Sequence, residues 1–209
     1  DNGDTQVTFQ APGAPVKYRL GNEADTFVEL GFDHRFSLPP NLSKANAPSS
    51  FQLVAMLQSY APYGESNNLD IDSISQLYIK ADDLIAPGVD VWIGRRYYGR
   101  REIHLNDYFW LNSGQGAHAG AGIEGLKTGL GQFHAAVFMI EDKLSDSGQH
   151  INTTTLDLRH DGITVGDTGE IGLWLYGALR HQEVELNLEE RSGFGFGIWH
   201  QHAPIPNST

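Results

Sequence analysis

The stretch that decides the fold is residues 169–180, which read GEIGLWLYGALR. Its apolar side chains recur at every second position: Ile171, Leu173, Leu175 and Leu179. The opposite parity carries larger polar or aromatic side chains: Glu170, Trp174, Tyr176 and Arg180. Because successive side chains of a β-strand point to opposite faces, this alternation predicts a strand with one apolar and one polar face.

The same alternation continues along the chain and predicts about nine strands in all. Residues 18–32 have mostly apolar even positions and mostly charged odd positions, which predicts a strand or a strand pair around residues 21–22. The other expected strands are residues 51–60, 71–80, 89–98, 119–126, 130–141, 151–160, 169–182 and 193–202. The segments between them are rich in Pro, Gly and Asn, which is typical of loops. No repeat or linker divides residues 1–209, so we expect one domain.

The composition favours an all-β protein and excludes several classes of function. The chain has 24 Gly, 9 Pro and 11% aromatic residues among its 209, which suits many strands joined by tight turns. It has no Cys, so it offers neither a disulfide nor a thiolate metal site. Its net charge of −12 repels nucleic acid, and we expect no nucleic-acid partner.

Two architectures fit this alternation. No apolar run approaches the ~20 residues of a spanning helix, but a strand of a transmembrane β-barrel needs only ~10 alternating residues. A soluble β-sandwich also has strands with one buried and one wet face. The N-terminal residues 1–4 lack the basic and apolar regions of a signal peptide, so an exported chain would be mature or trimmed here.

Two segments resemble the maltoporin family of carbohydrate porins. Residues 17–23 (KYRLGNE), followed by 27–30 (FVEL), are similar to an early strand pair of that family. Residues 92–110 (WIGRRYYGRREIHLNDYFW) are similar to the family's strand that runs into a loop folded inside the barrel. The two matches occur in the same order as in the family, and together they favour the barrel over the sandwich.

The resemblance implies a transmembrane antiparallel β-barrel of about 18 strands when complete, of which this chain would supply about half. It further implies a homotrimer in the outer-membrane lipid of a Gram-negative bacterium. Such a channel passes maltose, maltodextrins or related oligosaccharides by facilitated diffusion, along aromatic rings flanked by polar side chains. Ions also pass through the pore. A sheet of about nine strands alone would leave two open edges in hydrocarbon, so we expect the sequence to be incomplete.

The resemblance also implies a set of sugar-binding residues. Those that match the family's sugar path are Arg19, Phe27, Glu29, Arg100, Glu102, Asp107 and Phe109. The physical reason is that a pyranose has apolar C–H faces that lie on aromatic rings, and hydroxyl groups that pair with charged side chains. The structural alternatives are a packed aromatic at Phe27 and an ion-pair network around the arginines.

The chain departs from the family at several positions. Phe109 stands where the family has a tyrosine, which keeps the ring and loses the hydroxyl. Ser75 stands where we align a further arginine of the path, and residues 62–72 lack the family's tryptophan, which Tyr63 replaces only loosely. The family's loop disulfide has no cysteine here. These differences suggest a carbohydrate preference that diverges from maltodextrin.

Enzymatic and cofactor sites find little support in the sequence. His200 and His202 share one strand face, but no third metal ligand is identifiable. The Gly-rich residues 114–122 lack a phosphate-loop lysine and a strand-to-helix pattern. We therefore expect no catalytic residues, no metal and no cofactor. The alternative function is that of a soluble β-sandwich module that binds carbohydrate.

Two structural expectations follow from the barrel. The even-numbered residues 20–30 should face lipid or a neighbouring subunit, while Arg19, Phe27 and Glu29 face the lumen, because the opposite register would put charges in hydrocarbon. Residues 108–122 should fold partly into the barrel as a constriction loop, since a long Gly-rich segment follows an Arg-rich strand end.

Overall fold

The computed structural model describes residues 26–37, 50–61, 73–103, 108–110, 118–143, 150–181 and 189–202, and these form β-strands without any helix. The strands are β1 (Thr26–Ser37), β2 (Ser50–Ala61), β3 (Ser73–Ala81), β4 (Asp90–Arg96), β5 (Arg101–Ile103), β6 (Tyr108–Trp110), β7 (His118–Thr128), β8 (Gly131–Lys143), β9 (His150–Val165), β10 (Gly169–Arg180) and β11 (Arg191–His202). In this part of the chain, then, no helix has the length and apolarity to span a bilayer.

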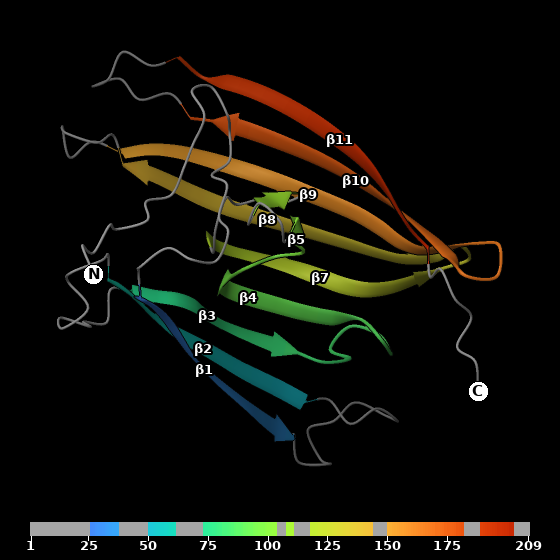
Figure 1. Ribbon diagram of the computed structural model, residues 1–209, viewed down its shortest axis with the longest axis horizontal. Coiled ribbons are helices and arrows are strands. Elements are labelled where there is room, and N and C mark those ends of the chain that lie inside the picture. Colours follow the sequence, from blue (N-terminus) through green and yellow to red (C-terminus); the bar gives the residue numbers. More distant parts are fainter. Residues whose placement is uncertain are drawn as a thin grey trace, which may run out of the picture.

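Nine strands form one antiparallel sheet in the order β1-β2-β3-β4-β7-β8-β9-β10-β11 (Figure 1). Strands that are neighbours in the sheet also follow one another in the chain, with one exception: β4 pairs with β7. The two strands between them in the sequence, β5 and β6, form a separate hairpin. This connectivity is that of an up-and-down meander, the arrangement from which antiparallel barrels are built.

One face of the sheet, here called the outer face, is apolar and exposed. Residues directly opposite each other in neighbouring strands point to the same side, so the register gathers side chains into rows across the sheet. One outer row consists of Leu53, Ile79, Ile93, Ala121, Val137 and Leu156. Phe194 is 84% exposed and Phe196 is 76% exposed on this face. An apolar surface of this extent marks contact with a membrane or with protein.

The opposite face, here called the inner face, is polar and aromatic and is partly covered. Its central row consists of Arg35, Gln52, Lys80, Trp92, Gly122, Ala136, Asp157 and Tyr176. Trp92 and Asp157 are fully buried, and Phe138 is nearly so. The core of the described structure therefore lies against this face, around Trp92, Tyr98 and Phe138.

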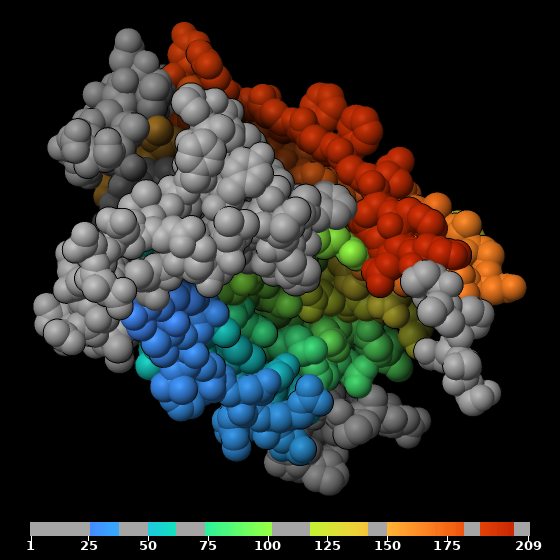
Figure 2. Space-filling model, viewed as in Figure 1, coloured from blue at the N-terminus to red at the C-terminus, as the bar shows by residue number. Residues whose placement is uncertain are grey.

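The sheet curves around residues 97–103, here called the inward segment. Tyr98 contacts Trp92 of β4, with ring centroids 5.4 Å apart, while the guanidinium of Arg101 lies 3.4 Å from the ring centroid of Trp199 on β11. Four strands separate β4 from β11 in the sheet, at a spacing of ~4.8 Å per strand. The three residues from Tyr98 to Arg101 span at most ~10 Å. Strands β4 and β11 therefore both contact this short segment, which requires the sheet to curve around it. Figure 1 shows β5 between the two edge strands of the sheet, β1 and β11, and in Figure 2 light-green atoms lie beside the red atoms of β11.

The structure differs from the sequence-based expectations in two places. The first strand extends to Ser37, beyond the expected end at residue 32. Of the expected constriction loop, residues 108–122, residues 118–122 are instead the start of β7 in the nine-stranded sheet, here also called the wall, and pair with β4. Residues 108–110 form β6, which pairs with β5, and residues 111–117 lie outside the described residues. Among the described residues, the inward segment, which begins directly after β4, crosses the inner face.

Candidate functional site

The inward segment leaves the wall where β4 ends and lies over the inner face. Tyr98 is 3% exposed and packs between Trp92 and Phe138, with ring centroids 5.4 Å and 5.5 Å away. Gly99 then takes φ = 52°, a conformation that favours glycine, and so turns the chain across the sheet. A buried aromatic anchor followed by a glycine turn therefore directs this segment inward.

Glycines in the wall make room for this aromatic cluster. A Cβ atom at Gly122 would lie 2.7 Å from Nε1 of Trp92, and one at Gly120 would lie 2.6 Å from the ring of Phe138. Both distances are shorter than side chains tolerate, so the rings lie directly on the backbone of β7. The Gly-rich sequence of β7 is thus matched to the large rings of β4 and β8.

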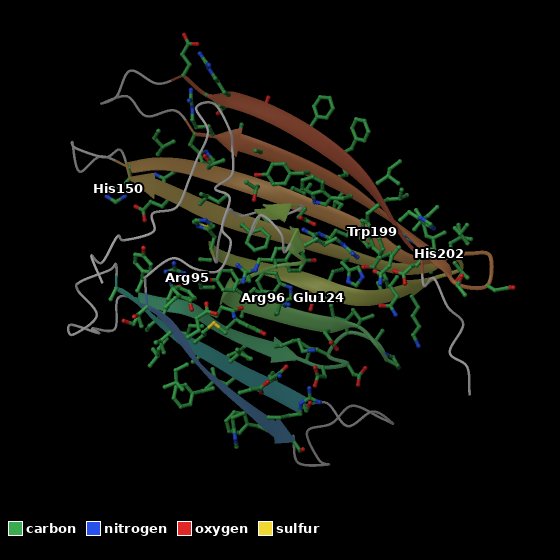
Figure 3. The ribbon with its side chains drawn as sticks, viewed as in Figure 1. Arg95, Arg96, Glu124, His150, Trp199 and His202 are labelled. Atoms are coloured by element: carbon green, nitrogen blue, oxygen red, sulfur yellow. The ribbon has the colours of Figure 1, made fainter. Side chains whose placement is uncertain are left out.

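Arg96 joins the aromatic cluster to a charged part of the wall. Its guanidinium lies 4.8 Å from the ring centroids of both Tyr78 and Trp92, which is within the range of cation–π attraction. The same group forms an ion pair with Glu124 at 3.1 Å, and Figure 3 shows the two side chains together. Arginine is well suited to this position because its planar group can stack and donate at once.

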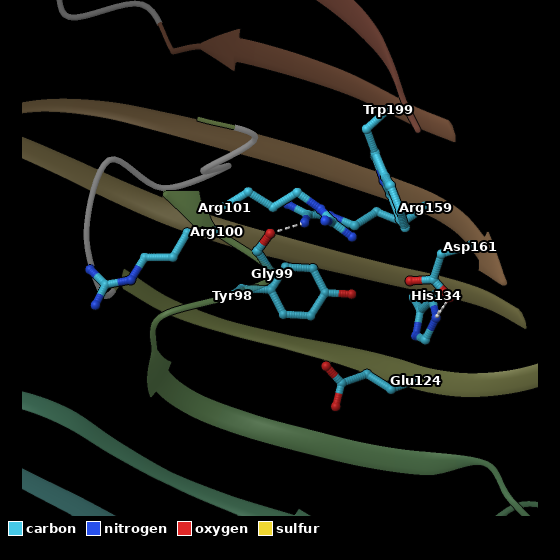
Figure 4. Close-up of a pocket in the computed structure, with 9 residues that line it drawn as sticks. All are labelled: Tyr98, Gly99, Arg100, Arg101, Glu124, His134, Arg159, Asp161 and Trp199. Carbon is cyan, nitrogen blue, oxygen red and sulfur yellow. Dashed lines mark hydrogen bonds and ion pairs between the residues drawn. The ribbon is translucent and has the colours of Figure 1, made fainter. Parts of the chain in front are cut away.

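A second charged group connects the inward segment to β9. One carboxylate oxygen of Asp157 accepts a hydrogen bond from Nε of Arg159 at 2.8 Å. The other oxygen accepts hydrogen bonds from Nη2 of Arg159 and Nε1 of Trp174, each at 2.8 Å. The remaining Nη1 of Arg159 donates to the carbonyl oxygen of Gly99 (Figure 4). The guanidinium also lies 5.1 Å from the ring centroid of Tyr98.

A cavity of about 390 Å³ lies between the inward segment and the wall. Its lining residues are Tyr98, Gly99, Arg100, Arg101, Glu124, His134, Arg159, Asp161 and Trp199 (Figure 4). The Tyr98 hydroxyl points into it, has no hydrogen-bond partner among the described residues, and has its pKa raised by burial. The lining offers guanidinium donors beside carboxylate acceptors, which suits neutral hydroxyl groups.

His134 is held in one orientation at the edge of this cavity. Its Nδ1 accepts from the backbone N–H of Gly125 at 3.2 Å, and its Nε2 pairs with Asp161 at 3.1 Å. With Nδ1 as acceptor, Nε2 carries the proton and donates to Asp161. Both ring nitrogens are thereby occupied within the wall.

The structure describes five of the seven expected sugar-binding residues. Arg19 and Asp107 lie outside the described residues. Phe27 and Glu29 lie on β1, opposite Tyr60 and Gln58 in the register, and therefore share the inner face. Val28 and Leu30 lie exposed on the outer face. Figure 1 shows β1 at the edge of the sheet, well away from the inward segment.

The other three expected residues belong to the inward segment and its hairpin. Arg100 precedes β5, with its guanidinium 3.6 Å from the ring centroid of Tyr97. Glu102 of β5 stands opposite Phe109 of β6 in the hairpin register. The structure thus brings these three positions together and leaves Phe27 and Glu29 as a separate group.

Several residues of the site were not expected from the sequence: Tyr98, Asp157, Arg159, Trp174 and Trp199. The pattern of residues 156–161, LDLRHD, contains a signal that could have found two of them. Its odd positions are charged while Leu156 and Leu158 occupy the even ones, which marks a polar face on that strand. Among the described residues, no cluster of three His, Asp or Glu side chains has the arrangement of a metal site.

Comparison with known proteins agrees with this geometry. The LamB porin family model matches residues 1–209. A maltoporin of Hahella chejuensis (strain KCTC 2396) is 33% identical over 180 residues, which cover 83% of this chain and 40% of that protein. The chain therefore spans less than half the length of this curated relative. With a matching family model, this relative and a nine-stranded antiparallel sheet, the chain belongs to the LamB porin family of β-barrel proteins.

Proposed function

We propose that the protein containing this chain is a carbohydrate channel of a Gram-negative outer membrane and not an enzyme. The observation that carries the proposal is the contrast between the two faces of one curved sheet. The outer face is apolar and exposed, and the inner face carries rings and charges around the inward segment. Membership of the LamB porin family and the relative named maltoporin support the same function.

In this channel, sugars pass along the inner face of the barrel. Aromatic side chains at Phe27 and Phe109 lie against the C–H faces of a pyranose, and the charged side chains exchange hydrogen bonds with its hydroxyls. The charged set comprises Arg19, Glu29, Arg100, Glu102 and Asp107. These contacts replace bound water without holding the sugar so tightly that it cannot leave, as conduction requires.

The preferred substrates are maltose and maltodextrins or related oligosaccharides, and the assembly is a homotrimer. Phe109 lacks the hydroxyl of the family's tyrosine, so at this position the channel recognises ring faces more than individual hydroxyl groups. We therefore expect a broader range of sugars, with discrimination that depends on length.

Reconstitution in planar bilayers tests the function. Maltodextrins of increasing length are titrated into open channels of the full-length protein while the small-ion current is recorded. A carbohydrate channel shows a saturable block whose binding constant rises with chain length. Glycerol at matched viscosity serves as the control for nonspecific effects on the current. A conducting channel that no oligosaccharide blocks would leave a general porin and reject the carbohydrate specificity.

A soluble β-sandwich that binds carbohydrate is the alternative, and the outer face argues against it. A sandwich buries one face of each sheet against the other sheet. Here the described nine-stranded sheet exposes its apolar face, and the small β5–β6 hairpin lies on the other side. Extraction separates the two: a channel requires detergent to leave the membrane and migrates as a heat-modifiable trimer, whereas a sandwich dissolves in buffer.

A further inference from the structure

We infer that Asp157 and Arg159 are positioning residues: they form a clamp that fixes the inward segment against β9 and so sets where Arg100 and the β5–β6 hairpin stand in the channel. The inference rests on the proposed channel function and adds to it the residues that hold its narrow part in place. Neither Asp157 nor Arg159 is among the sugar-binding residues proposed above.

The first step of the argument is the burial of the pair. Asp157 has no exposed surface, and a carboxylate in that position destabilises the fold unless donors surround it. Three donors do so, two from Arg159 and one from Trp174, all at 2.8 Å. This bidentate geometry fixes the plane of the guanidinium, which becomes a rigid part of the wall.

The second step is what the fixed guanidinium does with its remaining donor. Nη1 of Arg159 reaches the carbonyl oxygen of Gly99, which lies 60 positions earlier in the chain. The guanidinium also lies against the ring of Tyr98, 5.1 Å from its centroid. Two consecutive residues of the inward segment therefore meet one wall residue, immediately before Arg100.

The third step is that the segment has space to move without the clamp. The opposite side of Tyr98 packs against Trp92 and Phe138, but its hydroxyl faces the cavity of about 390 Å³. A close-packed segment would stay in place after the loss of one contact. Beside a cavity of this size, loss of the Gly99 contact lets residues 99–103 shift, and Arg100 shifts with them.

The test compares single-channel currents of small ions in the full-length protein, in the absence of sugar. Arg159→Lys keeps the charge beside Asp157 but loses the planar fork, and Asp157→Asn keeps the shape and loses the charge. Asp90→Asn is the matched control, because Asp90 pairs with Lys80 at 2.8 Å on the same face without touching the inward segment. We expect both clamp variants to spend about tenfold more time in altered conductance levels, the factor expected for one charge-assisted hydrogen bond. The control should match the wild type.

A second readout reports the segment itself. A nitroxide label on cysteine introduced at Arg100 is expected to be immobilised in the wild-type background and mobile in the Arg159→Lys background, while a label at Met139 on the outer face stays unchanged. The inference would be overturned if folded clamp variants showed the wild-type time in altered conductance levels and an immobilised label. Failure of both variants to insert as folded channels would also overturn it, because the pair would then serve the wall alone. Neither readout uses sugar, so an absence of sugar block in the wild type would count against the proposed function only.

Discussion

At the scale of single residues, Arg100 is one of the side chains that we propose to bind a passing sugar. It directly follows the clamped Gly99, and its guanidinium stacks on Tyr97 at 3.6 Å. Replacing Arg100 with Ala should weaken sugar block roughly tenfold or more, because a charge-assisted hydrogen bond contributes ~1.5–3 kcal/mol. Small-ion conductance should change less, since a hydrated ion needs no such partner. Maltodextrin titration in planar bilayers measures both quantities.

Arg95→Ala is the matched control for this experiment. It removes the same charge from the neighbouring strand, on the exposed outer face opposite Leu77. The sugar-block constant of this variant should equal that of the wild type. An unchanged constant in Arg100→Ala as well would exclude Arg100 from the sugar path.

Gly122 is a second position where one residue has a large effect. An added methyl group would lie 2.7 Å from Nε1 of Trp92, and overpacking of this kind costs ~1–3 kcal/mol. Gly122→Ala should therefore lower the free energy of unfolding by that amount, measured by urea titration in lipid vesicles. Gly177→Ala is the control, since nothing lies within 4 Å of its added methyl group, and its stability should stay within ~0.5 kcal/mol of the wild type. Equal losses in both variants would contradict the close packing of Trp92 on β7.

The candidate site could be predicted from the sequence only where its residues are near one another in the chain. Arg100, Glu102 and Phe109 fall in one motif and meet in one segment and its hairpin. The contact of Arg159 with Gly99 joins residues 60 positions apart, and alternation carries no information about which strand faces which loop. The contact between Arg159 and Gly99 therefore could not be predicted from the sequence, although the alternation in residues 156–161 does indicate a polar face on that strand.

At the scale of elements, alternation was a sufficient guide to the wall. The expected strand at residues 169–182 is Gly169–Arg180 in the structure, and the expected strand at residues 193–202 is Arg191–His202. The predicted first strand ended too early because Asp33 and Arg35, which follow Gly31, reduce the apolar character of the segment. In the structure both residues belong to β1 and lie on its inner face. The β5 and β6 strands have three residues each, which is too short for a periodic pattern.

The polar network at one end of β1, β2 and β3 should make stability depend on pH. Burial opposes the ionisation of Asp82, but hydrogen bonds from Ser50 and Lys80 and the charges of Lys80 and Arg35 outweigh it and lower the pKa of Asp82 from its ordinary value of 3.8. A carboxyl with a lowered pKa in the folded state stabilises the fold above its unfolded pKa and loses this effect as the pH falls through the folded pKa.

We therefore expect Asp82→Asn to be less stable than the wild type at pH 7 and to approach the wild-type free energy of unfolding as the pH falls below 3.8 and through the lowered pKa of the folded state. Urea titrations across this range measure the difference. Asp167→Asn, in the turn between β9 and β10, is the control for the loss of a carboxylate outside this network. A constant offset between Asp82→Asn and the wild type would show that the lost contacts do not depend on charge.

At the scale of the whole molecule, the outer face should act as a lipid-facing belt. Val137 lies in the central outer row between Ala121 and Leu156. Val137→Arg should lower stability in lipid vesicles by ~2–4 kcal/mol, the cost of arginine at the middle of a bilayer. Leu130→Arg is the matched control, because Leu130 is 72% exposed in the turn between β7 and β8. Its loss should stay below ~1 kcal/mol. Equally small losses at both positions would indicate a face in contact with water.

The excursion of the chain between β4 and β7 also bears on the order in which the wall assembles. Every other neighbouring pair in the described sheet is closed by a shorter connection, whereas the pairing of Arg96 with His118 closes the longest one. The entropy of closing a loop rises with its length, by ~0.6 kcal/mol for each doubling. The pairs within β1–β4 and within β7–β11 can therefore form first as two local meanders. Their joining at β4 and β7 is then the most non-local of the neighbouring pairings in the described sheet.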